Sequence, residues 1–107
     1  MPRYLFTARY SPESAKTIMA TGGTARATNI DKMIAGLNGR MESFHFAFGD
    51  NDAYVIVELP DAQSAAAVAL TINGTGVAQV RTTALLTPEE LDAAAKMHPD
   101  YRPPAAG

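Results

Sequence analysis

Apolar residues follow two different periods along this chain of 107 residues. Four segments rich in aliphatic and aromatic residues predict β-strands, at residues 3–10, 40–48, 53–59 and 77–86. Between them, apolar residues recur at the spacing of an α-helix. Ile30, Met33, Ile34 and Leu37 form one such stripe, and Ala65, Val68, Ala69 and Ile72 form another made of smaller residues. The predicted order is therefore strand, helix, strand, strand, helix, strand.

Capping residues mark the ends of the predicted helices. Ser11-Pro12-Glu13 starts the first, and Asn38-Gly39 ends it. Pro60-Asp61 and Asn73-Gly74 bound the second in the same way, and Thr87-Pro88-Glu89-Glu90 predicts a short third helix with a capping box. Thr21-Gly22-Gly23-Thr24 weakens the first helix. Since Met19 and Ile30 are eleven residues apart, close to three turns, their apolar side chains could share one face of a kinked helix, and the glycine pair is equally compatible with a break.

This order of elements predicts an α+β fold. Two right-handed crossovers around a central hairpin give a ferredoxin-like β-α-β-β-α-β sandwich, with a four-stranded antiparallel sheet and a short C-terminal helix. Both long helices then cover one face of the sheet, and something else must cover the other. We expect a second copy to stack there and form a dimeric α+β barrel. A single domain is predicted over residues 1–98, followed by a proline-rich tail over 99–107.

Strand parity assigns side chains to the two faces of the predicted sheet. Phe44, Phe46 and Val55 are expected beneath the helices, with Phe48 paired to Ala53 across a four-residue turn. The opposite face is called the free face below. Its expected members are Leu5, Thr7, Arg9, Ser43, His45, Ala47, Tyr54, Ile56, Glu58, Gln79, Arg81, Thr83 and Leu85. A half polar, half apolar face of this kind is typical of an interface or a pocket.

Composition narrows the classes of partner. Nine Lys and Arg against eleven Asp and Glu give a net charge of −2, which argues against nucleic acid as a partner. The absence of cysteine excludes disulfides and thiolate metal sites. The longest uncharged stretch, 62–80, contains many polar residues and is not a membrane span. Because the first residues lack the apolar segment of a signal peptide, we expect a cytoplasmic protein.

One group of predicted free-face residues has the chemistry of a site. His45 can transfer protons near neutral pH, and Arg9 and Arg81 can hold a carboxylate or enolate oxygen. We therefore predict ligand-binding residues Arg9, His45, Tyr54, Glu58 and Arg81, with His45 as the best candidate for a catalytic residue. The alternative is structural, since Arg9 and Glu58 are expected on adjacent strands and can pair directly. The same residues then belong to a salt-bridge network at an interface.

Two further motifs have mainly structural interpretations. Asp50 and Asp52 flank Asn51, and paired carboxylates can bind a hard cation, but these residues also favour tight turns. Gly22-Gly23 lacks the surrounding pattern of a phosphate-binding loop. We therefore predict no metal and no cofactor.

The region from Ser43 to Asp61 resembles the GYD-domain family. Its sequence is SFHFAFGDNDAYVIVELPD, and the similarity continues through VRTT at 80–83, LLTPEE at 85–90 and YRPP at 101–104. The chain departs from the family at Gly49-Asp50-Asn51-Asp52, where Asn51 stands in place of the family's aromatic residue. The resemblance implies a small bacterial protein of ferredoxin-like fold, grouped with dimeric α+β barrels, and it implies no specific activity.

Three functions are consistent with this sequence. The first is a homodimer with a site for an anionic or aromatic small molecule on the free face, by analogy with enzymes of similar fold. The second is a regulatory or structural dimer without catalysis. The third, a metal-dependent nuclease similar to the small CRISPR-associated nucleases, is disfavoured. Those proteins have an aspartate at the end of the first strand, where this chain has Arg9-Tyr10-Ser11-Pro12.

Overall fold

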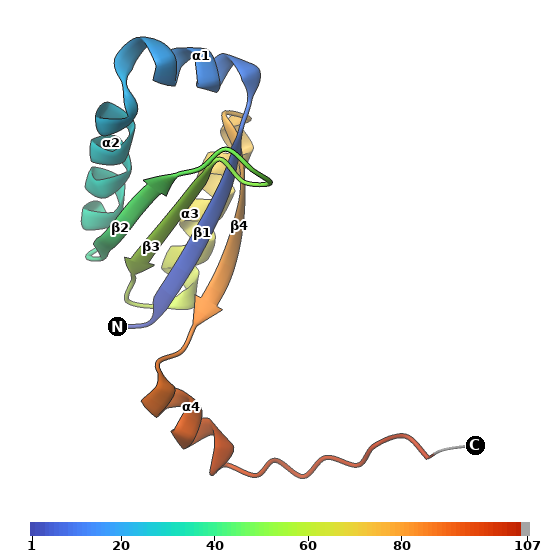
Figure 1. The fold of residues 1–107 in the computed structure, drawn as a ribbon. Helices are drawn as coiled ribbons and strands as arrows, with labels where there is room; N and C mark the ends of the chain where they lie inside the picture. Colours follow the sequence, from blue (N-terminus) through green and yellow to red (C-terminus); the bar gives the residue numbers. More distant parts are fainter. Residues whose placement is uncertain (106–107) are drawn as a thin grey trace.

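The computed structural model describes residues 1–105 and confirms the α+β fold. Ala106 and Gly107 of the predicted tail lie outside the described residues. The strands are β1 (Arg3–Tyr10), β2 (Arg40–Phe46), β3 (Ala53–Glu58) and β4 (Ala78–Leu85); the helices are α1 (Pro12–Thr21), α2 (Gly23–Gly36), α3 (Ala62–Thr75) and α4 (Pro88–Ala95). The strands form one antiparallel sheet in the order β2-β3-β1-β4, as expected for a ferredoxin-like arrangement (Figure 1).

The core lies between the sheet and the helices α2 and α3, which cover the same face (Figure 1). Ile34 of α2 and Val68 of α3 pack against alternate residues of the two central strands. The buried members of this cluster are Tyr4, Phe6, Ile34, Val55, Val57, Leu59, Ala65 and Val68. The predicted assignment of Val55 to the helix-covered face is therefore confirmed, and Tyr4 and Phe6 of β1 lie on the same face.

The predicted pairing in the β2–β3 hairpin is wrong by two residues. Ala53 pairs with Phe46 and Val55 with Phe44, so β2 ends at Phe46 and Phe48 is exposed. The connection is longer than predicted because Ala47 and Asp52 close it with a backbone hydrogen bond of 2.8 Å. The expectation that Phe44 and Phe46 are buried is also incorrect: Phe44 is half-buried and Phe46 is 43% exposed.

The first predicted helix is broken at Gly22 into two helices, α1 and α2. Gly22 has φ 90° and ψ 157°, a conformation that favours glycine, and α2 starts in a new direction at the next residue (Figure 1). Gly23 lies against the ring of Phe46, since a Cβ placed there would be 2.7 Å from a ring carbon. Met19 of α1 is exposed, so the α1 residues do not continue the apolar stripe of α2.

The other predicted helix ends are close to those observed. Asp61 and Thr87 cap α3 and α4 through their side chains, and the capping box of Thr87 and Glu90 is complete. α3 continues past the predicted stop at Asn73-Gly74 and ends at Gly76, which has left-handed backbone geometry. No helix within residues 1–105 is both long and apolar enough to cross a membrane.

Candidate functional site

The free face of the sheet is left uncovered by the helices. Thirteen residues were assigned to it, and all of them are half-buried or exposed in the structure. Its apolar members Leu5, Ile56 and Leu85 are half-buried, whereas their neighbours Phe6 and Val57 on the other face are buried. The same central strands therefore have buried side chains on one face and half-buried or exposed side chains on the other.

Three of the five candidate residues, His45, Tyr54 and Arg81, lie in a row across the free face together with Thr7. His45 of β2 pairs with Tyr54 of β3, Tyr54 pairs with Thr7 of β1, and Thr7 pairs with Arg81 of β4. Directly paired residues share a face, so their side chains project to the same side. His45 and Arg81 are separated by three inter-strand spacings, or about 14 Å between their backbones. Tyr54 is thus the cross-strand partner of His45, but the row is not a compact cluster.

The expected pair between Arg9 and Glu58 is wrong. Arg9 pairs with Gln79 at one end of the sheet, whereas Glu58 pairs with Arg3 at the other. Arg9 lies six positions after Arg3 on β1, which corresponds to about 20 Å along a strand. The five predicted ligand-binding residues therefore lie at three different levels of the sheet, and one small molecule cannot contact all five in one chain.

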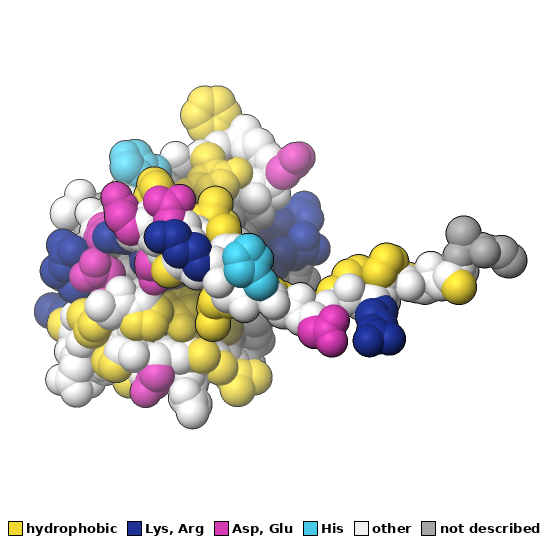
Figure 2. Space-filling view, turned by 90° about the horizontal axis from the view of Figure 1, so that it is seen from below, with side chains coloured by type: hydrophobic (Ala, Val, Ile, Leu, Met, Phe, Trp, Pro, Cys, Tyr) yellow, Lys and Arg dark blue, Asp and Glu magenta, His cyan; other side chains and the backbone are white. Residues whose placement is uncertain are grey.

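Glu58 instead belongs to a four-residue charged cluster at its own end of the sheet, composed of Arg3, Arg40, Glu42 and Glu58. Arg3 donates to Glu42 Oε1 at 2.6 Å and to Glu58 Oε1 at 3.2 Å. Arg40 donates to the same two carboxylates at 3.3 and 3.1 Å. Figure 2, which views the molecule from this end, shows acidic and basic side chains gathered side by side. The cluster is balanced in charge, so it supports a structural role for Glu58.

Sequence reasoning missed this charged cluster because β2 contains an irregularity. The pairing register of β2 shifts between Met41 and Ser43. As a result, Met41 and Phe44 both face the core. Arg40, Glu42 and Ser43 all lie outside the helix-covered face. Strict alternation assigns Glu42 to the wrong face. The signal available in the sequence was the pair of charges at Arg40 and Glu42 at the start of an otherwise apolar strand.

The charges also affect one another. The pKa of Glu42 is lowered, chiefly by the hydrogen bonds from Arg3 and further by the positive charges of Arg3 and Arg40. The pKa of Arg3 is raised for the reciprocal reason. Both groups therefore remain ionised throughout the neutral range, and the cluster is a fixed feature of this end of the sheet.

The turn at 49–52 uses its polar residues for structure. The Asp52 carboxylate accepts a hydrogen bond of 2.9 Å from the backbone N–H of Tyr10, and the Asp52 N–H donates to the Ala8 carbonyl. Asn51 donates from Nδ2 to the Tyr54 hydroxyl at 3.3 Å. The residue that replaces the expected aromatic side chain thus contacts the row of candidates beside His45.

The C-terminal segment extends away from the body that carries this face. Every residue of α4 is exposed, and Figure 1 shows the helix and the tail projecting below the sheet. The radius of gyration of 17.2 Å reflects this extension, since a compact chain of this length has a radius of about 13 Å. Leu86, Leu91 and Met97 carry apolar side chains that are 60%, 60% and 79% exposed along this segment.

The fold and this surface define a small α+β protein with one covered and one uncovered sheet face. A family model described as the GYD domain matches residues 4–95. The chain therefore belongs to the GYD-domain family, and the resemblance carried by residues 43–61 is confirmed. No curated protein and no solved structure gives a significant match to the chain.

Proposed function

We propose that this GYD-domain protein is a homodimer joined through the free face, with a binding site for an anionic or aromatic small molecule beside His45. The observation that carries the proposal is the incomplete burial of Leu5, Ile56 and Leu85 on a face that the helices do not reach. Two such faces packed together bury each other's apolar residues. The exposed apolar residues in and beside α4, Leu86, Leu91 and Met97, offer further contact surface to a second copy.

Closure of the sheet edges explains how dispersed residues can form one site. β2 and β4 are the edge strands of the sheet. On β4, the Asn73 side chain accepts from the Val80 N–H at 2.7 Å and donates to the Val80 carbonyl at 3.2 Å, so the remaining edge positions are the ones open to a partner. A closed barrel of two four-stranded sheets places β2 of one copy beside β4 of the other. His45 and Tyr54 on β2 and β3 then lie near Arg81 of the partner subunit, which can hold a ligand carboxylate. Neither chain forms this site alone.

Light scattering during size exclusion tests the dimer. At tens of micromolar the mass should be about twice the chain mass of 11.3 kDa. Ile56→Glu places a charge in the centre of the free face and should give the monomer mass. Leu70→Glu is the matched control, because Leu70 is 74% exposed on α3, on the opposite side of the molecule. A monomeric natural chain, or a dimer that survives Ile56→Glu, contradicts the proposed interface.

An NMR shift titration with benzoate and related aromatic acids tests the ligand site. Shifts at His45, Tyr54 and Arg81 that disappear in Ile56→Glu support a site formed by two chains. The second candidate function is a regulatory or structural dimer without catalysis. It is favoured by the wide spacing of the five candidate residues within one chain, since one small molecule cannot contact them all. A stable dimer whose free face is unaffected by every acid would establish that alternative.

A further inference from the structure

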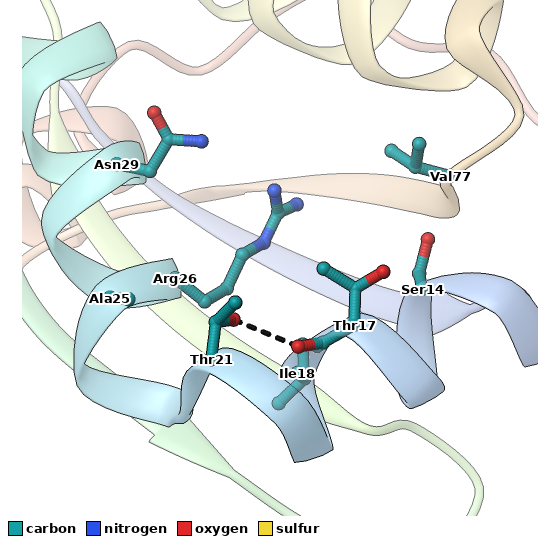
Figure 3. Close-up of a pocket in the computed structure, with 8 residues that line it drawn as sticks. All are labelled: Ser14, Thr17, Ile18, Thr21, Ala25, Arg26, Asn29 and Val77. Carbon is teal, nitrogen blue, oxygen red and sulfur yellow. Dashed lines mark hydrogen bonds between the residues drawn. The ribbon is translucent and has the colours of Figure 1, made fainter.

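A hollow of about 370 Å³ lies on the helical side of the molecule, away from the free face. It opens between α1 and α2 and is closed by Val77 immediately before β4 (Figure 3). Its lining is Ser14, Thr17, Ile18, Thr21, Ala25, Arg26, Asn29 and Val77. The break at Gly22 creates this hollow, because it turns α2 away from the line of α1. Its volume is within the range of small-molecule sites.

Arg26 is the charged residue of this lining, and its guanidinium points into the hollow (Figure 3). Its Nε is buried and has no hydrogen-bond partner in the described chain. The ion pairs found among residues 1–105 join Arg3 and Arg40 to Glu42 and Glu58, and Arg26 takes part in none of them. The ring of Tyr10, 5.5 Å from the guanidinium carbon, supports the cation without neutralising it. No carboxylate of the described chain neutralises this guanidinium, and its terminal nitrogens can give charge-assisted hydrogen bonds to an anion in the hollow.

Only some of the polar side chains around Arg26 have donors left for a ligand. Thr17 and Thr21 donate their hydroxyl protons to the backbone carbonyls of Glu13 and Thr17. Ser14 instead accepts from the Ser11 hydroxyl at 3.0 Å, which leaves its own proton free. The amide of Asn29 adds a further donor beside the guanidinium (Figure 3). The free donors in the hollow are therefore Ser14, Arg26 and Asn29, a set that suits a carboxylate.

The remainder of the lining is apolar. Ile18, Ala25 and Val77 contribute carbon surface, together with the methyl groups of the two threonines. The single positive charge of Arg26 suits a ligand with one negative charge, and the apolar walls of the hollow suit a ligand with a hydrocarbon body. We propose that this hollow binds a small monocarboxylate with an apolar body, oriented by Arg26. This site is separate from the proposed dimer interface and does not depend on it.

The test is a calorimetric and NMR titration of the full chain with benzoate and hexanoate, with benzamide as the neutral control. Benzoate or hexanoate should bind and shift the amide resonances of 14–29 and Val77. Benzamide, and benzoate with Arg26→Met, should bind at least about tenfold more weakly, because each lacks the charge-assisted contact. Lys32→Met removes an exposed positive charge from the same helix, outside the lining of the hollow, and should leave this binding unchanged.

A second variant keeps the proposal testable if Arg26→Met disturbs folding. Ala25→Leu retains the arginine but fills the hollow from an exposed position on α2, and it should also abolish binding. Equal affinity for benzoate and benzamide would overturn the proposal, as would the absence of binding by either acid. Shifts confined to His45, Tyr54 and Arg81 would overturn this site while supporting the separate one on the free face. Conversely, a monomer that still binds benzoate at Arg26 would overturn only the dimer.

Discussion

The two faces of the sheet are built from the same strands, but their side chains are buried to different extents. On the helix-covered face, Phe6, Val55 and Val57 are 5%, 6% and 0% exposed. On the free face, their sequence neighbours Leu5, Tyr54 and Ile56 are half-buried or exposed. The difference shows that the helices of this chain bury one face of the sheet and leave the other open. Substitutions that act on one face should therefore behave differently from those on the other.

The largest expected effect separates two adjacent residues of β1. Phe6→Ala leaves a cavity in the core and should lower the free energy of unfolding by about 3–5 kcal/mol. Leu5→Ala acts on the free face and should cost about 1–2 kcal/mol, with a loss that depends on protein concentration if two copies share this face. Chemical denaturation at two protein concentrations measures both. Equal losses in the two variants would contradict the assignment of the faces.

The next largest effect is expected at Gly39, where the backbone lies close to the end of β3. Gly39 lies where α2 leads into β2, and a Cβ there would be 2.5 Å from the Glu58 carbonyl oxygen. Gly39→Ala should therefore destabilise the fold by about 2 kcal/mol through overpacking. Gly74 on α3 has no atom within 4 Å of such a Cβ. Gly74→Ala should be neutral or stabilise by about 0.5–1 kcal/mol in the same thermal or chemical unfolding experiment.

A smaller effect is expected at the margin of the covered face. Phe46 is 43% exposed but contacts the rings of Tyr10 and Phe44, with centroid distances of 6.4 and 4.9 Å. Phe46→Ala should cost about 1–2 kcal/mol, less than Phe6→Ala, because part of the ring is already in water. A loss in chemical denaturation equal to that of Phe6→Ala would show that the ring is covered in solution.

The smallest expected effect is electrostatic and concerns Glu42 in the charged cluster, outside the helix-covered face. The lowered pKa of Glu42 means that the stability it contributes is present above the ordinary glutamate pKa and is lost as the pH falls through its lowered value. Arg3→Gln should raise the pKa of Glu42 toward the ordinary value, as measured by the carboxyl carbon shift in an NMR titration. Asp61 is the control, since its pKa is lowered by hydrogen bonds from Ser64 and should not respond. An unchanged pKa at Glu42 would show that Arg3 does not hold it in solution.

Local sequence signals predicted the elements of this fold well. The bounds of β1 at Arg3–Tyr10 and the capping box at Thr87 and Glu90 match the structure. These features depend on neighbours within a few residues, so the sequence contains the information directly. The free-face positions of His45 and Tyr54 also followed from strand parity alone, as did the burial of Val55 on the opposite face.

Features that depend on distant contacts could not be obtained in this way. The irregularity between Met41 and Ser43 places Glu42 in the cluster with Arg3. Strict alternation along a strand cannot predict such an irregularity. The turn at 49–52 shifted the hairpin register because Asp52 bonds to β1, which is remote in sequence. Arg26 faces a hollow because the chain changes direction at Gly22, and a glycine pair allows a kink and a break equally. Local propensity therefore determined where the elements begin and end, whereas packing between them determined which side chains meet.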